Sequence, residues 1–271
     1  MPVRRGRGAA GPGDPQVVVV VSATTEWRAV AALHPDGRRR RTPFGEWFVM
    51  AGRPAGLAVA VVYGGWGKVA SAASAQYVID RFSPQLLVNL GTCGGFAGAV
   101  ERGEVLLADE TLVYDIVERM TDADEAIVDR AASIDLSWLD GPDGPATAAF
   151  PTPVRRVRLL SADCDIAPSQ VDLLHERYGA IAADWESGAI AWVAARNGVP
   201  CLILRAVSDL VDAAGGEVYE DYAEFERRSL EVMRTLFAAL PAWLAAWARR
   251  PEGWTPTHAT REARPADDDA W

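Results

Sequence analysis

The chain has 271 residues, of which 49% are hydrophobic, and its formal net charge is −10 at pH 7. This length suits one large domain or two small ones, and the apolar fraction supplies a full core. An acidic chain with no sustained basic patch beyond its N-terminal residues argues against a nucleic-acid partner. Cys93, Cys164 and Cys201 lack metal-ligand spacing and predict buried free thiols of a reducing compartment.

The two ends of the chain differ in composition from the middle. Residues 1–15 carry arginines but no apolar signal-peptide core, and we predict a disordered tail there. Residues 250–271 are predicted to be a second disordered tail, which leaves 16–249 as the folded domain. The apolar run at 17–21 is too short to span a bilayer. We therefore expect a cytoplasmic protein with no membrane partner.

Within residues 16–249, apolar strand patterns alternate with helical patterns. The expected strands, in chain order, are 17–22, a hairpin-like pair at 47–51 and 57–63, then 85–90, 104–107, 111–115, 158–161 and a strand from 201 that ends at Asp209. The expected helices are 26–33 with Thr24 or Thr25 as its N-cap, 69–81, 170–178, a helix that includes Glu186 and breaks at 198–200, and 219–249. Residues 118–150 read as an irregular or partly helical insertion.

Several of these strands are almost entirely apolar, so both faces of their sheet must be covered. Together with the alternation of strands and helices, this predicts a layered α/β fold. Ligands in such folds bind at the carboxyl ends of the strands. Most of the unusual polar residues and glycines follow strands, at 22–26, 63–68, 91–96, 161–166 and 208–212.

Two glycine-rich stretches call for a choice between motifs. Residues 91–95 of "NLGTCGGF" hold three glycines, which would let a ligand approach backbone N–H groups; a tight turn is the alternative. "GGWGKV" at 64–69 is not a nucleotide phosphate loop, because Val62 and Val69 replace the required glycine and hydroxyl residue.

Three carboxylates, Glu26, Glu186 and Asp209, stand at the ends of expected strands or helices. Each has an ordinary alternative role: helix-dipole stabilisation, a solvated helix start and an N-cap, respectively. The three histidines are predicted to be surface residues, and no cluster has metal-ligand spacing, so we expect no metal and no cofactor.

Six segments occur in one order along the chain: "VVVSATTEW", "GGWGKVASA", "NLGTCGGF", "GEVLLADE", "SADCDI" and "ADWESGAIAWVAARNGVPCLILRAVSD". In this order the chain resembles the nucleoside phosphorylase/nucleosidase superfamily over residues 17–245, most closely its methylthioadenosine/S-adenosylhomocysteine nucleosidase branch. The resemblance implies a single-domain three-layer α/β/α fold with a mixed, partly closed central sheet. It also implies a homodimer, a small-molecule nucleoside as substrate and cleavage of an N-ribosidic bond.

The resemblance also assigns roles to residues. Asp209 matches the general acid that protonates the leaving base, and Glu26 matches the residue that activates water. Glu186, with Trp185 beside it, matches the residue that holds the ribose hydroxyls. The remaining matches are Ser208 and Arg205, which would orient Asp209; Thr92 and Gly94 in the pocket wall; Asp163 and Ile166 at the base-binding strand end; and Tyr219, which would cover the substrate.

Water is favoured over phosphate as the nucleophile. Phosphorylases of this superfamily carry a Gly-Asp-Pro phosphate loop after the first strand, whereas here Gly13, Asp14 and Pro15 precede it. The charge of Glu26 would also repel phosphate. The alternatives are a phosphate-dependent phosphorylase and a nucleoside-binding module without catalysis.

The chain departs from the nucleosidase pattern at three substrate-facing positions. Asp165 stands where an aromatic ring stacks on adenine, Trp66 where an aliphatic residue lines the 5′ pocket, and Trp185 where a methionine contacts ribose. The catalytic pattern is thus kept while the specificity pattern differs, which suggests a nucleosidase of secondary metabolism as a hypothesis.

Overall fold

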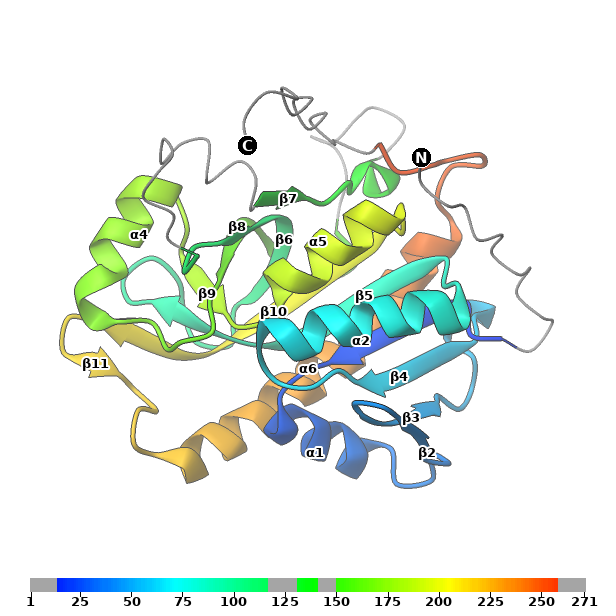
Figure 1. The fold of residues 1–271 in the computed structure, drawn as a ribbon, viewed down its shortest axis with the longest axis horizontal. Coiled ribbons are helices and arrows are strands. Elements are labelled where there is room, and N and C mark those ends of the chain that lie inside the picture. Colours follow the sequence, from blue (N-terminus) through cyan, green and yellow to red (C-terminus); the bar gives the residue numbers. More distant parts are fainter. Residues whose placement is uncertain (1–13, 117–130, 141–149, 258–271) are drawn as a thin grey trace, which may run out of the picture.

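The computed structural model describes residues 14–116, 131–140 and 150–257, which form one large mixed sheet between helices (Figure 1). Its strands are β1 (Val17–Val21), β2 (Arg40–Thr42), β3 (Gly45–Val49), β4 (Val59–Tyr63), β5 (Leu86–Phe96), β6 (Val105–Val113), β7 (Ala131–Ser133), β8 (Arg155–Ser161), β9 (Ala182–Asp184), β10 (Cys201–Asp212) and β11 (Gly215–Gly216). Its helices are α1 (Thr24–Leu33), α2 (Gly67–Phe82), α4 (Val171–Tyr178), α5 (Ser187–Asn197) and α6 (Tyr222–Ala248), with short 3-10 turns η1 (Pro54–Gly56), η2 (Ser137–Leu139) and η4 (Pro168–Gln170).

The sheet closes partly on itself. Strand β10 pairs with β5 on one side and with β6 on the other. Strand β6 also pairs with β8, β8 with β9, and β9 with β5, so that these five strands form a ring. The parallel strands β1 and β4 extend the sheet outward from β5. The predicted mixed, partly closed sheet is therefore confirmed.

Helices cover both faces of the sheet and make it the middle of three layers. Helices α2 and α5 pack against each other on one face, whereas α6 packs against α1, β5 and β10 on the other (Figure 1). The five valines of β1 are completely buried because helices lie on both sides of them. This arrangement accounts for strands that are apolar along their whole length.

The two central strands run further than their apolar patterns predicted. Residues 91–96, expected to be a glycine-rich loop, continue β5, and β10 extends past Asp209 to Asp212. Gly94 and Gly95 pair with Asp209 and Leu210 of β10. A Cβ atom at Gly95 would lie only 2.5 Å from Val100 and 2.8 Å from Val207, so glycine lets the ladder continue in this crowded place.

Three expected helix positions need correction. Helix α1 starts at Thr24, and its N-cap residue is Ala23 rather than Thr24 or Thr25. Glu186 precedes α5 as its N-cap residue instead of lying within the helix. Helix α6 begins at Tyr222, where the Asp221 side chain accepts a hydrogen bond from the Glu224 N–H at 3.0 Å, so Tyr219 lies in the preceding turn.

Two segments outside the expected elements also have regular or packed structure. Part of the insertion expected at 118–150 lies outside the described residues, but residues 131–133 form β7 beside β6, a strand that we did not predict. Residues 250–257, assigned from sequence to a disordered tail, lie against the domain. There the Trp254 ring packs edge-on against Trp247, and its indole N–H donates to Ser137 Oγ at 3.0 Å.

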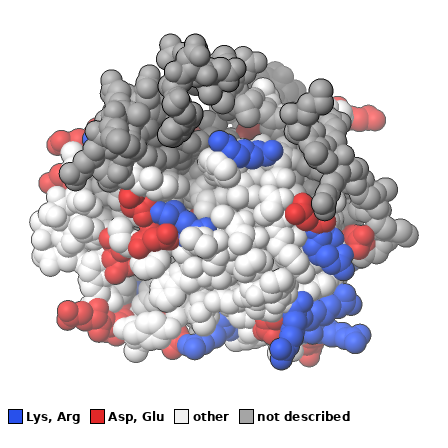
Figure 2. Space-filling model, in the orientation of Figure 1, with Lys and Arg blue, Asp and Glu red and all other residues white. Residues whose placement is uncertain are grey.

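The face formed by α2 and α5 carries few charged side chains, whereas basic side chains gather around β2 (Figure 2). Val69 on α2 and Trp192 on α5 are exposed there. The homodimer implied by the resemblance stays a prediction. Within the described ranges, no helix combines the length and apolarity needed to cross a membrane.

Candidate active site

A cavity of about 620 Å³ opens where β1, β5, β9 and β10 end. Residues that follow β4 and β8, and the turn before α6, complete its walls. Apart from Asp163, the residues predicted to be catalytic or substrate-binding all line this one cavity: Glu26, Trp66, Thr92, Gly94, Asp165, Ile166, Trp185, Glu186, Ser208, Asp209 and Tyr219. Residues far apart in sequence thus meet at the strand ends, as expected for a layered α/β fold.

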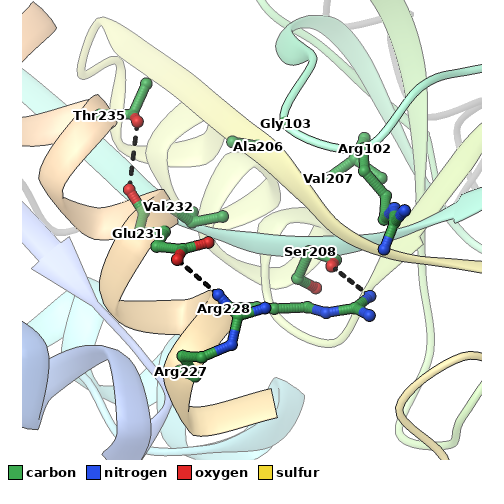
Figure 3. A pocket seen from close by; sticks show the side chains of 10 residues that line it. All are labelled: Arg102, Gly103, Ala206, Val207, Ser208, Arg227, Arg228, Glu231, Val232 and Thr235. Carbon is green, nitrogen blue, oxygen red and sulfur yellow. Dashed lines mark hydrogen bonds and ion pairs between the residues drawn. The ribbon is translucent and has the colours of Figure 1, made fainter. Parts of the chain in front are cut away.

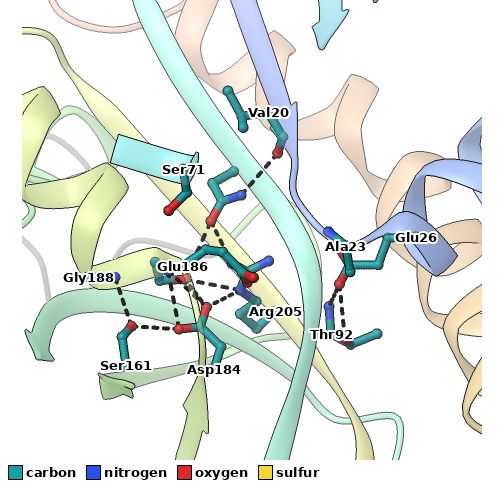
Figure 4. Close-up of polar contacts among 12 residues, drawn as sticks. Val20, Ala23, Glu26, Ser71, Thr92, Ser161, Asp184, Glu186, Gly188 and Arg205 are labelled. Atoms are coloured by element: carbon teal, nitrogen blue, oxygen red, sulfur yellow. Dashed lines mark hydrogen bonds and ion pairs between the residues drawn. The ribbon is translucent and has the colours of Figure 1, made fainter. Parts of the chain in front are cut away.

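Glu26 is held in the first turn of α1 by three hydrogen bonds (Figure 4). Ala23 has no side-chain cap to offer, so Glu26 Oε2 reaches back to the Ala23 N–H at 3.1 Å. Its other oxygen, Oε1, accepts from the Thr92 N–H at 2.6 Å and from Thr92 Oγ1 at 2.9 Å. Since a carboxylate oxygen has two acceptor positions, Oε2 can still accept one hydrogen bond from a molecule in the cavity.

A buried ion pair lies next to the cavity. Arg205, on β10, donates from Nε to Asp184 Oδ2 at 2.6 Å, and only 1% of either side chain is exposed. Its Nη2 donates to Asn89 on β5 at 2.7 Å, and Asp184 also accepts from Ser161 Oγ at 2.6 Å and from Ser187 Oγ (Figure 4). The network therefore ties β5, β8, β9, α5 and β10 together beneath the site.

Gly91 makes room for this network. A Cβ atom at this position would lie 1.9 Å from Arg205 Nη1 and 2.7 Å from Glu26 Oε1. Any other residue at position 91 would displace the guanidinium group or the carboxylate. Glycine at this position thus lets two of the site's charged groups approach the same point of the β5 backbone.

Glu186 lies against both the network and helix α2. Its Oε1 accepts from the Gly67 N–H at 3.0 Å, and its Oε2 lies 4.0 Å from Arg205 Nη2. Burial and the nearby charge of Asp184 raise the pKa of Glu186 to about 8, although Arg205 opposes this rise. Near neutral pH this carboxyl can therefore donate or accept hydrogen bonds at the cavity wall.

The expected role of Arg205 is contradicted, since its hydrogen bonds go to Asp184, Ser187 and Asn89 rather than to Asp209. Between Val207 and Asp209 the register of β10 against β5 shifts by one residue. This bulge breaks the alternation that would place Arg205 and Asp209 on the same face of a regular strand. Arg205 therefore supports Asp184 and Glu186.

Asp209 lies just beyond the bulge and is only 5% exposed. Ser208 Oγ lies 2.6 Å from Asp209 Oδ1, so the predicted contact between these neighbours is present. Burial raises the pKa of Asp209, while the hydrogen bond from Ser208 and the charge of Arg228 act in the opposite direction. A carboxyl group that keeps its proton to higher pH is suited to act as an acid.

Two tryptophans form one side of the cavity. Trp66 at the start of α2 stacks on Trp185, with ring centroids 5.3 Å apart and an interplanar angle of 27°. Trp66 is 55% exposed, so one of its faces remains available to a ligand or to solvent. The stack narrows this side of the cavity with a flat aromatic surface.

Asp165, Ile166 and Tyr219 contribute to another side of the cavity. The Tyr219 hydroxyl donates to the Ile166 carbonyl at 2.8 Å, which ties the turn before α6 to the segment after β8. Burial, together with the charges of Asp165 and Asp209, raises the pKa of Tyr219. The phenol therefore remains neutral and can donate over the working pH range.

Asp163 does not line the cavity. It accepts from the Lys68 N–H at 2.7 Å and so caps the first turn of α2, and its side chain is 42% exposed. The structure thus places Asp163 beside the helix that carries Trp66, outside the expected base-binding position.

Sequence reasoning missed several cavity residues. The sequence motifs do not assign Asp184 to the site, and they assign the turn before α6 and its first residues only through Tyr219. The additional lining residues include Cys93, Asp184, Val211, Val218, Glu220, Tyr222 and Phe225. The dense run of acids and aromatic rings in "EVYEDYAEF" was the available signal for the last four.

No group of three or more histidine, cysteine or acidic side chains in residues 14–116, 131–140 and 150–257 could hold a metal ion. Four carboxylates of the cavity interact instead with backbone N–H groups, hydroxyls or Arg205: Glu26, Asp184, Glu186 and Asp209.

Comparison with known proteins finds nucleosidases of similar sequence. A methylthioadenosine/S-adenosylhomocysteine nucleosidase of Maridesulfovibrio salexigens is 29% identical over 214 residues, which cover 75% of this chain and 91% of that protein. The nucleosidase of the same name from Tolumonas auensis is 26% identical over 189 residues, covering 67% and 81%.

Solved structures show the same fold. The methylthioadenosine/S-adenosylhomocysteine nucleosidase of Campylobacter jejuni matches with a TM-score of 0.64 at 19% identity, over 84% of this chain and 99% of that one. The futalosine hydrolase of Helicobacter pylori matches with a TM-score of 0.65 at 19% identity, over 83% and 97%. The model of the phosphorylase superfamily matches residues 16–241. The chain therefore belongs to the phosphorylase superfamily.

Proposed function

We propose that this protein is an N-ribosyl hydrolase that releases the free base from a purine nucleoside, most suitably a 5′-modified adenosine. The observation that carries the proposal is the meeting of Glu26, Glu186 and Asp209 in one cavity, each in a different environment. Each environment supports a different task in the cleavage of the bond between ribose C1′ and the base nitrogen.

Asp209 serves as the general acid. As the C1′–N bond breaks, its electron pair moves onto the purine, which leaves readily only if a ring nitrogen is protonated. Asp209 supplies that proton, and burial supports this role by raising the pKa of its carboxyl. Ser208, 2.6 Å from Asp209 Oδ1, fixes the carboxyl orientation.

Glu26 serves as the base that activates water. Its hydrogen bonds to Ala23 and Thr92 hold the carboxylate in place while one acceptor position on Oε2 remains available. The water oxygen bonds to C1′ of the oxocarbenium-like ribose, and its proton passes to Glu26. The products are the free base and the ribose derivative.

Glu186 holds the ribose hydroxyls. Its carboxyl group is fixed by the Gly67 N–H and faces the cavity beside Trp185. Hydrogen bonds to a sugar hydroxyl strengthen as charge develops at C1′, so this contact favours the transition state.

The charges of the cavity favour water over phosphate. The described lining residues include no lysine, arginine or histidine, whereas six carry carboxyl groups: Glu26, Asp165, Asp184, Glu186, Asp209 and Glu220. A phosphate dianion would enter this cavity against like charge, with no side-chain cation to receive it. A neutral water molecule meets no such barrier.

The relatives that carry the name methylthioadenosine/S-adenosylhomocysteine nucleosidase support a 5′-thioadenosine as substrate. The Trp66–Trp185 stack narrows one side of the cavity. We therefore expect a small 5′ group, as in methylthioadenosine, to fit better than the homocysteine arm of S-adenosylhomocysteine.

The test is base release from adenosine, methylthioadenosine, S-adenosylhomocysteine, 5′-deoxyadenosine, inosine and cytidine, each with and without phosphate. Chromatography of the free base should show turnover without phosphate, fastest for methylthioadenosine. Glu26→Gln should lose this activity, whereas Glu176→Gln, a matched change at an exposed position of α4, should keep it.

Release that occurs only with phosphate would assign the chain to the phosphorylases and overturn hydrolysis. Binding of nucleosides in a thermal-shift assay without release of base would identify a binding module. An unchanged rate in Glu26→Gln would show that water is activated elsewhere.

A further inference from the structure

The bulge that carries Asp209 is braced from outside the cavity. The register shift leaves Ser208 without a partner residue in the ladder between β10 and β5. Its carbonyl oxygen accepts instead from Arg228 Nη1 of α6 at 3.1 Å, and Figure 3 shows the Arg228 side chain extended toward Ser208. The Arg228 side chain is 13% exposed.

Glu217 extends this brace to the other side of Asp209. The same Arg228 Nη1 lies 2.8 Å from Glu217 Oε2, which accepts from the Leu210 N–H at 3.2 Å. The Glu217 N–H also donates to the Leu210 carbonyl at 3.0 Å. Arg228 and Glu217 therefore hold the backbone immediately before and immediately after Asp209.

We propose that Arg228 is a positioning residue for catalysis: with Glu217, it fixes the β10 bulge and so aims the Asp209 carboxyl at the leaving base. This inference rests on the proposed function, since it assumes that Asp209 is the general acid. Arg228 itself contacts neither cavity nor substrate; it lines a separate hollow of about 360 Å³ on the α6 side of β10 (Figure 3).

The charges of the brace also reach Asp209. Arg228 lowers the pKa of Asp209, whereas Glu217 and Asp165 raise it. Ser208 donates to the carboxyl, and Tyr219 and Cys93 are the other titratable groups that interact with it. Removing one charge of the brace should therefore change the pH at which Asp209 loses its proton.

The neighbouring arginine provides a matched control. Arg227 pairs with Glu224 and Glu231 on the same helix, and 54% of its side chain is exposed. Arg227→Met and Arg228→Met change the net charge equally at adjacent positions. Only the second removes a contact to the bulge.

The experiment measures kcat and KM against pH for base release from methylthioadenosine without phosphate. Arg228→Met should lower kcat roughly 10- to 100-fold, more than it changes KM, because the acid is misaligned. Its alkaline limb should move to higher pH by about half a unit or more, since Asp209 loses a nearby positive charge. Arg227→Met should match the wild type in both respects.

Two further variants separate position from charge. Glu217→Gln keeps an acceptor for the Leu210 N–H but removes the negative charge, so its alkaline limb should move to lower pH. Arg228→Lys keeps the positive charge but loses the planar guanidinium group that contacts both Ser208 and Glu217. The alkaline limb of its pH profile should therefore return toward the wild-type position, whereas kcat should stay low. Thermal unfolding identifies any variant that fails to fold, in which case Arg228→Lys and Glu217→Gln carry the test.

The inference would be overturned if Arg228→Met and Arg227→Met had the same kcat and the same alkaline limb in their pH profiles. If the wild type releases no base, the proposed function fails. A ¹³C NMR titration of the Asp209 carboxyl then decides whether Arg228 acts on it: a pKa equal in Arg228→Met and wild type would overturn the brace independently of turnover.

Discussion

Glu186 and Asp209 are both buried in the same cavity, yet the protein surrounds them in different ways. Beside Glu186, polar side chains of five elements are joined to one another by hydrogen bonds, and the Gly67 N–H donates to Glu186 itself. Around Asp209 lie a single hydroxyl contact and side chains that face open space. We name Glu26, Thr92, Asp184, Glu186 and Arg205, whose polar groups are held by contacts within the protein, the inner wall. We name Trp66, Asp165, Trp185, Asp209 and Tyr219 the outer wall.

Substitutions in the inner wall should mainly change stability, whereas substitutions in the outer wall should mainly change substrate binding or reaction. Inner-wall groups are each other's partners, so a change in one leaves another buried and unpaired. Outer-wall groups mainly present surfaces to the cavity, so a change there alters what binds or reacts. The same site should thus respond to substitution in two distinct ways.

The largest effect expected is on turnover, from an outer-wall change. Asp209→Asn removes the proton that the leaving base requires and should lower kcat by about 10²- to 10⁴-fold. The midpoint of thermal unfolding should stay close to that of the wild type. A rate near wild type in the base-release assay would remove Asp209 from the mechanism, and a large loss of stability would place it with the inner wall.

The next effect is on stability, from an inner-wall change. Arg205→Met leaves Asp184 buried without its ion-pair partner and should lower the free energy of unfolding by about 3–5 kcal/mol. Urea denaturation measures this loss, with Arg158→Met as the control because the Arg158–Glu110 pair is partly exposed.

A double variant sharpens the result. Asp184→Asn together with Arg205→Met should cost less than the sum of the two single changes, since neither charge is then left alone. Simple additivity would mean that the inner wall is not energetically coupled.

A smaller effect is expected on substrate choice. Trp66→Ala removes one ring of the outer-wall stack and should raise kcat/KM for S-adenosylhomocysteine relative to methylthioadenosine by roughly tenfold. Competition between the two nucleosides in one reaction measures the ratio directly. A ratio unchanged from wild type would show that the tryptophans do not face the 5′ group.

The last prediction concerns the pH dependence of stability. The pKa of Glu186 is about 8 in the folded protein, so from about pH 4.5 to about pH 8 the unfolded chain binds fewer protons at this residue than the folded one. The contribution of Glu186 to the free energy of unfolding therefore falls as pH rises through this window. Glu186→Gln does not titrate, so its stability relative to wild type should increase from pH 5 to about pH 8. A constant difference, as expected for the exposed control Glu176→Gln, would contradict the raised pKa.

Much of the fold and the membership of the cavity followed from local sequence patterns. Apolar strands covered on both sides and polar residues just after them are properties of short segments, and they located Glu26, Thr92 and Asp209 at one edge of the sheet. The roles of the wall residues came from the family pattern and stay predictions until they are tested.

Local sequence patterns did not predict the hydrogen-bond and ion-pair partners of the charged groups. A regular strand period places Arg205 and Asp209 on the same face, and only the pairing of β10 with β5 reveals the intervening bulge. The bond from the Gly67 N–H to Glu186 joins residues 119 positions apart, and nothing local to either segment indicates it. Only the pairing of distant strands shows that Arg205 interacts with Asp184 and not with Asp209.

The bulge in β10 has a consequence for how this chain can change in length. Arg205 belongs to the buried network and Asp209 to the cavity, and the extra residue at Ser208 is what separates their faces. Inserting one more residue between them while the bulge is kept would turn the carboxyl of Asp209 toward the face that holds the guanidinium group, even if every existing side chain were kept. Along this strand, an engineer can exchange side chains one at a time, but inserting a residue before Asp209 would move its side chain from the cavity face to the face of the buried network.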